Sequence, residues 1–116
     1  MDVTTDELAE RLGELAVLDV RTPVEYSGER GYPCDPRQGH VPGARNVPVD
    51  DLLGRPPEEV RALVGLPEGA EVVAYCHAGS RSAMAAAALR AAGYRARNYP
   101  GSWHEWSRRD DLPAEA

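Results

Sequence analysis

The segment around residue 76 constrains the fold of this chain more than any other. An apolar run, Val72–Tyr75, is short enough for a buried strand and ends at Cys76. A loop of small residues follows, and the alanine-rich stretch from Ser82 to Ala92 predicts a helix. The pattern therefore predicts a strand, a sharp turn and a helix, with a thiol at the helix N-terminus.

This position gives the thiol a chemical role. The N–H groups of the loop and of the first helical turn lack intrahelical partners, and the helix dipole favours negative charge there. A cysteine so placed, with Arg81 nearby, ionises more readily than a free one. Cys76 is therefore the candidate nucleophile, and the alternative is a buried, inert thiol at a strand end.

Apolar runs alternate with helical patterns along the rest of the chain. This order is typical of an α/β fold with a mostly parallel sheet and helices on both faces, in which ligands bind at the carboxyl ends of the strands. We expect one domain over residues 1–116 and a sheet of about five strands. The patterns place strands at 16–20, 44–47, 72–75 and 94–99, and helices at 6–12, 23–26, 56–64 and 82–92.

Charge and cysteine content exclude several classes of partner and compartment. A net charge of −6 and an isoelectric point near 5.0 argue against nucleic acid and anionic membranes, because both require a basic surface. The first residues are acidic and polar, unlike a secretory signal, and no apolar run approaches the roughly 18 residues of a membrane span. Two cysteines in a chain of this length fit a reducing compartment. We therefore expect a cytoplasmic protein.

Four short motifs occur in the order and at the spacing of one known family. Through them the chain resembles, over most of its length, the single-domain rhodaneses, which are sulfurtransferases. The last motif, with its two tryptophans, is similar to the second halves of tandem thiosulfate sulfurtransferases. The motifs span Leu18–Tyr26, Gly39–Pro48, Cys76–Ser82 and Gly101–Trp106.

The resemblance implies a rhodanese-like fold and the transfer of sulfane sulfur without a cofactor. The Cys76 thiolate would take the outer sulfur of a donor such as thiosulfate, release sulfite and hold the sulfur as a persulfide. Cyanide or a thiol, including a protein thiol, would then accept it. Backbone N–H groups of the loop would stabilise the sulfur anion. The implied active-site loop consists of His77, Ala78, Gly79, Ser80, Arg81 and Ser82.

Loop length separates this reaction from related ones. Phosphatases and arsenate reductases that resemble this family have one residue more between cysteine and arginine, which makes room for a tetrahedral oxyanion. Only four residues lie between Cys76 and Arg81, so we favour sulfur transfer. Relatives that resemble one another in their specificity for thiosulfate carry cations straight after the cysteine, whereas this chain has His77 and Ala78. We therefore expect thiosulfate to be a weak or surrogate donor. A further alternative is a regulatory or relay module that carries sulfur to a protein partner without turnover on small donors.

Several polar residues are candidates for supporting roles. Arg81 either contacts an oxyanion or forms a structural ion pair with Asp19 or Glu25, and the sequence leaves both interpretations open. We expect Asp19 and Arg21 to support the active-site loop rather than to react. His40 is expected to fix a turn through a hydrogen bond, with a role as ligand or base as the alternative.

The loop from Ser27 to Pro42 is long for a compact domain, and loops of that length are usually functional or mobile. Cys34 in this loop is interpreted as a bystander thiol, and the alternative is that it resolves the persulfide or receives its sulfur. Trp103 and Trp106 lie one helical turn apart and are assigned to the core, with a wall of the pocket as the alternative. We expect no metal site, because the recognised zinc-ligand spacings are absent among Cys34, His40, Cys76 and His77.

Overall fold

The computed structural model describes residues 2–116 and contains one sheet of parallel strands in the order β2-β1-β3-β4. Over these residues the sheet has four strands, so the expected count was wrong by one. The N-terminal segment adds no further strand, because it makes one bond to the sheet edge, from the Val3 N–H to the Asn98 carbonyl (2.8 Å), and then enters a helix at Thr5. The strands are β1 (Ala16–Asp19), β2 (Arg45–Asn46), β3 (Glu71–Tyr75) and β4 (Arg95–Asn98).

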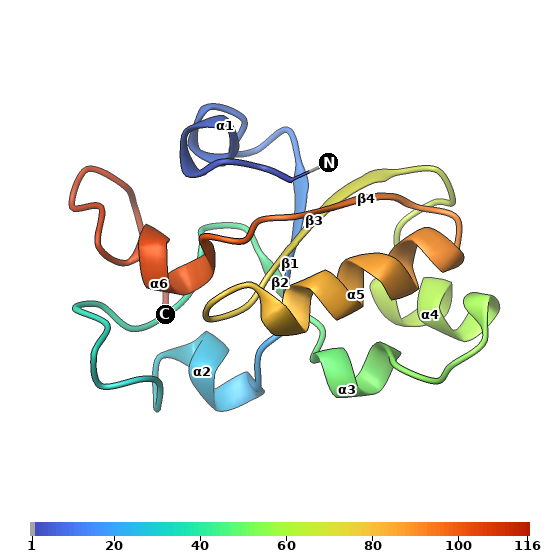
Figure 1. Cartoon of the computed structure of the whole chain (residues 1–116), viewed down its shortest axis with the longest axis horizontal. Coiled ribbons are helices and arrows are strands. Elements are labelled where there is room, and N and C mark those ends of the chain that lie inside the picture. The colour runs from blue at the N-terminus through green and yellow to red at the C-terminus, as the bar shows by residue number, and fades with distance from the viewer. Residues whose placement is uncertain (1) are drawn as a thin grey trace.

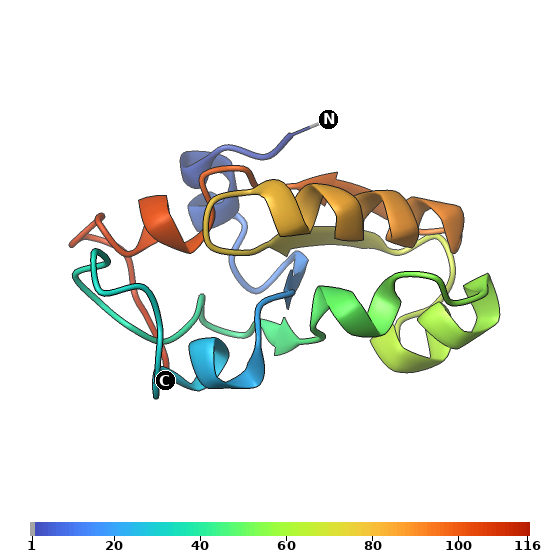
Figure 2. The ribbon, with the colours of Figure 1, turned by 60° about the horizontal axis from the view of Figure 1, so that its bottom comes forward.

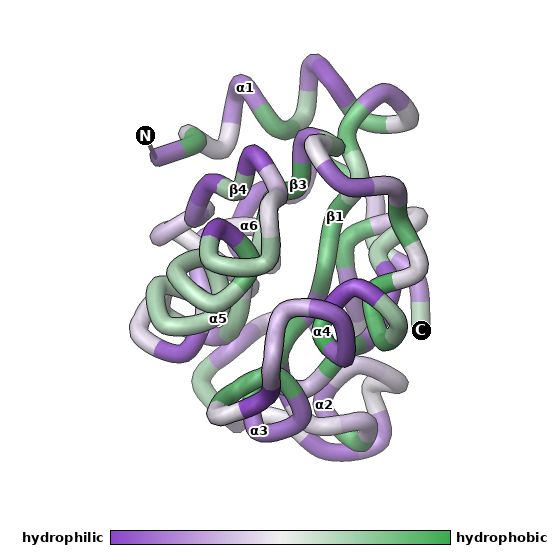
Figure 3. Tube along the Cα trace, turned by 90° about the vertical axis from the view of Figure 1, so that its right-hand side faces the viewer, coloured by the Kyte–Doolittle hydropathy of each residue, from purple (hydrophilic) through white to green (hydrophobic). Residues whose placement is uncertain are grey.

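Helices cover both faces of the sheet, which confirms the α/β expectation. Figure 1 shows α1 above the strands and α3, α4 and α5 below them. Alternation along β3 explains the two layers: Val72 and Ala74 pack in the cluster with α4 and α5, and Val73 and Tyr75 pack in the cluster with α1 and α6. Figure 3 shows that the central strand β1 is mostly apolar, as a strand covered on both faces requires. The helices are α1 (Thr5–Glu10), α2 (Pro23–Ser27), α3 (Val49–Leu52), α4 (Pro57–Val64), α5 (Ser80–Ala91) and α6 (Ser102–Trp106).

The helix α5 follows the candidate nucleophile and is the longest in the described chain. It begins two residues earlier than expected and ends before Gly93, whose φ is +98°. Alanines form much of its buried face and let it pack closely on β3 and β4. The helix expected at 6–12 is shorter, and α3 was not expected because one turn is too short for a periodic pattern. Within residues 2–116 no helix is long and apolar enough to cross a membrane.

The long loop between α2 and β2 is anchored to the C-terminal part of the chain. Figures 1 and 2 show it running beside α6. The Trp103 Nε1–H donates to the Arg37 carbonyl at 2.9 Å. His40 forms an isolated antiparallel bridge with Glu115. The loop also donates hydrogen bonds to the C-terminal part of the chain. The Arg37 guanidinium donates at 2.8 to 3.2 Å to the carbonyls of Trp106, Ser107, Arg109 and Leu112.

Candidate active site

Cys76 follows β3 at the carboxyl edge of the sheet, and only 1% of the residue is exposed. The Gly79 N–H donates to Cys76 Sγ at 3.1 Å. Ser82 contributes both its N–H and its hydroxyl, each 3.4 Å from the sulfur. Donors from both Gly79 and Ser82 therefore converge on one sulfur atom. Ala78 and Ser80 are exposed and form the outer side of the loop.

The pKa of Cys76 reflects two opposing effects. Burial of the thiol acts to raise its pKa, because a thiolate loses hydration inside a protein. The hydroxyl and N–H of Ser82 and the N–H groups of Gly79 and Ala78 outweigh burial, so the pKa of Cys76 lies below its usual value. The sulfur is thus stabilised as an anion by donors that the loop itself provides.

Gly79 lets the loop turn tightly enough to aim these donors. Its φ is +98°, a conformation that residues with a Cβ rarely adopt. A Cβ at this position would also lie 2.8 Å from the Pro100 carbonyl oxygen. On the other side, the Asn98 side-chain amide donates to the Gly79 carbonyl at 3.3 Å. The turn is therefore held between Pro100 and Asn98, and it requires a glycine.

Ser102 is the site residue that the sequence analysis did not single out, although it lies within one of the four motifs. Its hydroxyl accepts the Cys76 N–H at 3.1 Å and donates to the Tyr99 carbonyl at 2.8 Å. Among residues 2–116, Ser102 is the one non-glycine with positive φ, +55°. Backbone strain of this kind is often found at functional sites. Here it places a hydroxyl against the backbone of the candidate nucleophile.

Arg81 forms a two-point ion pair with Glu25, at 2.9 and 3.1 Å, so of the two partners considered the structure selects Glu25 over Asp19. The Glu25 carboxylate also accepts from the N–H and hydroxyl of Thr22, at 3.1 and 3.0 Å. Burial acts to raise the pKa of Glu25, but these partners lower it to about 2. The same carboxylate raises the pKa of Arg81. The pair therefore joins the active-site loop to α2.

Asp19 and Arg21 form a buried ion pair at the end of β1. Arg21 donates to both carboxylate oxygens of Asp19, with a shortest distance of 2.7 Å, and both side chains are almost fully buried. The Tyr75 hydroxyl donates to the same carboxylate at 2.6 Å and accepts the Val41 N–H at 3.0 Å. The Arg21 guanidinium lies 5.3 Å from the centroid of the Trp103 ring. This network connects β1, β3 and α6 with the segment at Val41.

His40 and Trp103 are both buried. His40 Nδ1 lies 2.8 Å from the Tyr26 carbonyl, and the two rings stack with centroids 3.7 Å apart. The His40 backbone exchanges two hydrogen bonds with Glu115, at 2.7 and 2.9 Å. Trp103 and Trp106 are fully buried in the core.

His77 directly follows Cys76, and its side chain contacts the long loop between α2 and β2. Its ring stacks on Tyr32 with centroids 3.6 Å apart, and its Nε2 lies 3.0 Å from Asp35 Oδ2. Cys34 is exposed in the adjacent loop and carries a free thiol. The structure therefore connects His77 to the loop around Cys34 rather than to the candidate nucleophile.

Known proteins with similar sequences are longer than this chain. The sulfur carrier protein TtuD of Thermus thermophilus is 34% identical over 97% of this chain and 45% of the relative. A thiosulfate sulfurtransferase of Pseudomonas aeruginosa is 37% identical over 97% of this chain and 45% of the relative. The chain thus spans under half the length of these relatives.

A solved structure and a family model agree with these relationships. The crystal structure of a probable thiosulfate sulfurtransferase matches 99% of this chain and 47% of that protein, with a TM-score of 0.87 and 45% identity. The family model for the rhodanese-like domain matches residues 4–109. The chain therefore belongs to the rhodanese-like domain family.

Proposed function

We propose that the chain is a sulfurtransferase that carries sulfane sulfur on Cys76. The convergence of the Gly79 N–H and of the two Ser82 donors on Cys76 Sγ carries this proposal. Such donors stabilise a thiolate, and they would equally stabilise charge that moves between the donor and the persulfide. The names of the similar proteins, thiosulfate sulfurtransferase and sulfur carrier protein, support the same class of reaction.

The reaction consists of two displacements at sulfur. The Cys76 thiolate attacks the outer sulfur of thiosulfate; the sulfur–sulfur bond of the donor breaks, and its electron pair leaves with sulfite. Cys76 is then a persulfide. Cyanide or a thiolate attacks the terminal sulfur, the persulfide bond breaks, and the Cys76 thiolate returns. Neither step requires a cofactor.

The donor is the open part of the proposal. The exposed rim of the loop carries Ala78 and Ser80, which offer no charge to grip a sulfonate, and His77 faces Asp35. Arg81 is the nearest loop cation, and Glu25 already neutralises it. We therefore propose that thiosulfate is a surrogate donor and that a persulfide of a protein or a small thiol is the better substrate.

Intact-mass spectrometry tests the central step. After incubation with thiosulfate, the wild-type chain should gain the mass of one sulfur atom, and cyanide should remove it as thiocyanate. Cys76→Ser should not gain this mass, while the matched variant Cys34→Ser should gain it fully. If Cys76→Ser still acquires sulfur, the nucleophile has been assigned to the wrong residue.

The second candidate function is a relay module that carries sulfur without turnover on small donors, and the similarity to a sulfur carrier protein supports it. Steady-state assays distinguish this hypothesis from the enzyme hypothesis. An enzyme should release thiocyanate through many turnovers with thiosulfate and cyanide. A relay module should instead transfer its sulfur once to a protein thiol and show no sustained turnover.

Phosphatase activity would appear as hydrolysis of an aryl phosphate that Cys76→Ser abolishes.

A further inference from the structure

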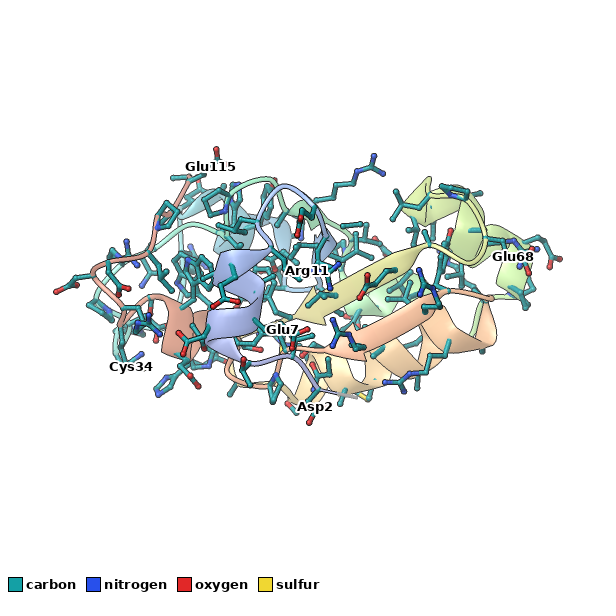
Figure 4. All side chains as sticks on the ribbon, turned by 90° about the horizontal axis from the view of Figure 1, so that it is seen from above. Asp2, Glu7, Arg11, Cys34, Glu68 and Glu115 are labelled. Carbon is teal, nitrogen blue, oxygen red and sulfur yellow. The ribbon has the colours of Figure 1, made fainter. Side chains whose placement is uncertain are left out.

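Four potential metal ligands from three segments meet beside the active-site loop. Cys34 and Asp35 belong to the long loop, His77 follows β3, and His104 lies on α6. One ligand atom from each residue lies within 4.8 Å of all the others. Figure 4 shows Cys34 at the end of the molecule where α6 lies, opposite Glu68. The cluster therefore depends on tertiary packing, since its members are far apart in the sequence.

Two buried atoms in this cluster have no hydrogen-bond partner. Asp35 Oδ2 and His77 Nε2 are both shielded from water, and the Asp35 side chain is only 1% exposed. The two atoms are 3.0 Å apart, close enough for an ion pair when the imidazole is protonated, but they do not form a hydrogen bond. A buried polar atom without a partner is costly, and a carboxylate oxygen especially so. An ion bound between the two atoms would give each of them a partner.

The chemistry of the cluster suits a metal ion. One thiolate, one carboxylate and two imidazoles are ligands that Zn²⁺ accepts in a tetrahedral arrangement. At zinc bond lengths of about 2.0 to 2.3 Å, neighbouring ligand atoms are about 3.4 to 3.7 Å apart. The separation of 3.0 Å between His77 Nε2 and Asp35 Oδ2 is slightly shorter than these values. His104 Nδ1 lies 3.5 Å from the other oxygen of the same carboxylate, Asp35 Oδ1. We propose that Cys34, Asp35, His77 and His104 bind one divalent transition-metal ion of the zinc type.

Neighbouring side chains hold the proposed ligands in place. Arg108 donates to Asp35 Oδ1 at 2.9 Å and to the Cys34 carbonyl at 2.8 Å, which leaves Asp35 Oδ2 free for the ion. The His77 ring stacks on Tyr32, and the backbone N–H of His104 donates to the backbone carbonyl of His77 at 2.9 Å. Partners of this kind orient ligands in known metal sites. Cys34 and His104 are exposed, so an ion can enter from solvent.

This ligand set differs from the one considered in the sequence. His40 is held by Tyr26 and Glu115, and Cys76 is enclosed by its own donors, so neither residue contributes. Asp35 and His104 take their places. The site is independent of the sulfur chemistry, because it requires nothing from Cys76.

Cobalt substitution tests the site in the full chain. The chelator-treated protein is titrated with Co²⁺ alone, and sulfur-to-cobalt charge-transfer absorption reports a thiolate ligand; Zn²⁺ should then displace the Co²⁺. The wild type and the matched cysteine variant Cys76→Ser should each bind one ion with this absorption. Cys34→Ser should lose the absorption, and His104→Ala should bind at least about tenfold more weakly, as the loss of even a supporting partner weakens metal sites by that factor.

The outcomes separate the proposal from its rivals. Cys34 and His104 are exposed, so both variants are expected to fold, and circular dichroism checks this. The proposal is overturned if the wild type shows no cobalt absorption, or if Cys34→Ser and His104→Ala bind as tightly as the wild type. It is equally overturned if Cys76→Ser abolishes the absorption, because the ion would then sit on the candidate nucleophile.

Discussion

The substitution Gly79→Ala tests whether the tight turn after Cys76 is required by its neighbours as well as by its backbone conformation. Gly79 and Gly13 have similar φ values, +98° and +90°. An alanine costs about 1 to 2 kcal/mol in such left-handed conformations. A Cβ added at Gly13 would have no neighbouring atom within 4 Å. A Cβ added at Gly79 would lie 2.8 Å from the carbonyl oxygen of Pro100 and 3.0 Å from the Cα of Pro100. Backbone atoms cannot move aside easily, and overpacking adds about 1 to 3 kcal/mol.

Urea unfolding of the two variants separates these contributions. We expect Gly13→Ala to lower the free energy of unfolding by about 1 to 2 kcal/mol and Gly79→Ala by about 2 to 5 kcal/mol. Gly79→Ala should also slow sulfur uptake from thiosulfate, because the crowded turn would shift and move its N–H away from Cys76 Sγ, while Gly13→Ala should not. Equal losses of stability in the two variants would refute the reasoning, since strain alone would then account for both.

Three further predictions concern the contacts around the loop. Glu25→Gln should destabilise the protein at neutral pH by up to about 3 kcal/mol, because the pKa of Glu25 is lowered to about 2. That contribution is present above the unfolded pKa of about 4.5 and is lost as the pH falls towards 2, so unfolding curves of the variant and the wild type should converge in acid. Tyr75→Phe should lower the free energy of unfolding by about 1 to 3 kcal/mol, measured in urea, because the buried Val41 N–H loses its acceptor and Asp19 loses a donor. Ser82→Ala should slow persulfide formation, followed by mass spectrometry, by at least about tenfold, because the Cys76 sulfur loses its hydroxyl donor; an unchanged rate would remove Ser82 from the site.

Local patterns predicted the parts of this protein that depend on neighbours in the sequence. The apolar run before Cys76 and the alanine-rich stretch after it indicated the β3–loop–α5 unit, which the structure contains. Strands that alternate with helices indicated the parallel α/β arrangement. These features follow from residue periodicity and from helix-terminus chemistry, which act over a few residues. The expected strand count was wrong because it exceeded the four strands that the local patterns placed, and the structure adds no further strand over the described residues.

Only the tertiary structure decided which distant side chains meet. Arg81 had two candidate partners in the sequence, and packing of α2 against the active-site loop selected Glu25. His77 looked like a neighbour of the nucleophile, yet it faces Asp35 and shares a cluster with His104. Such pairings join residues tens of positions apart, and their geometry depends on how loops and helices pack on the sheet. The spacing of residues along the chain does not predict that packing, whereas the turn around Cys76 depends on consecutive residues and could be predicted from them.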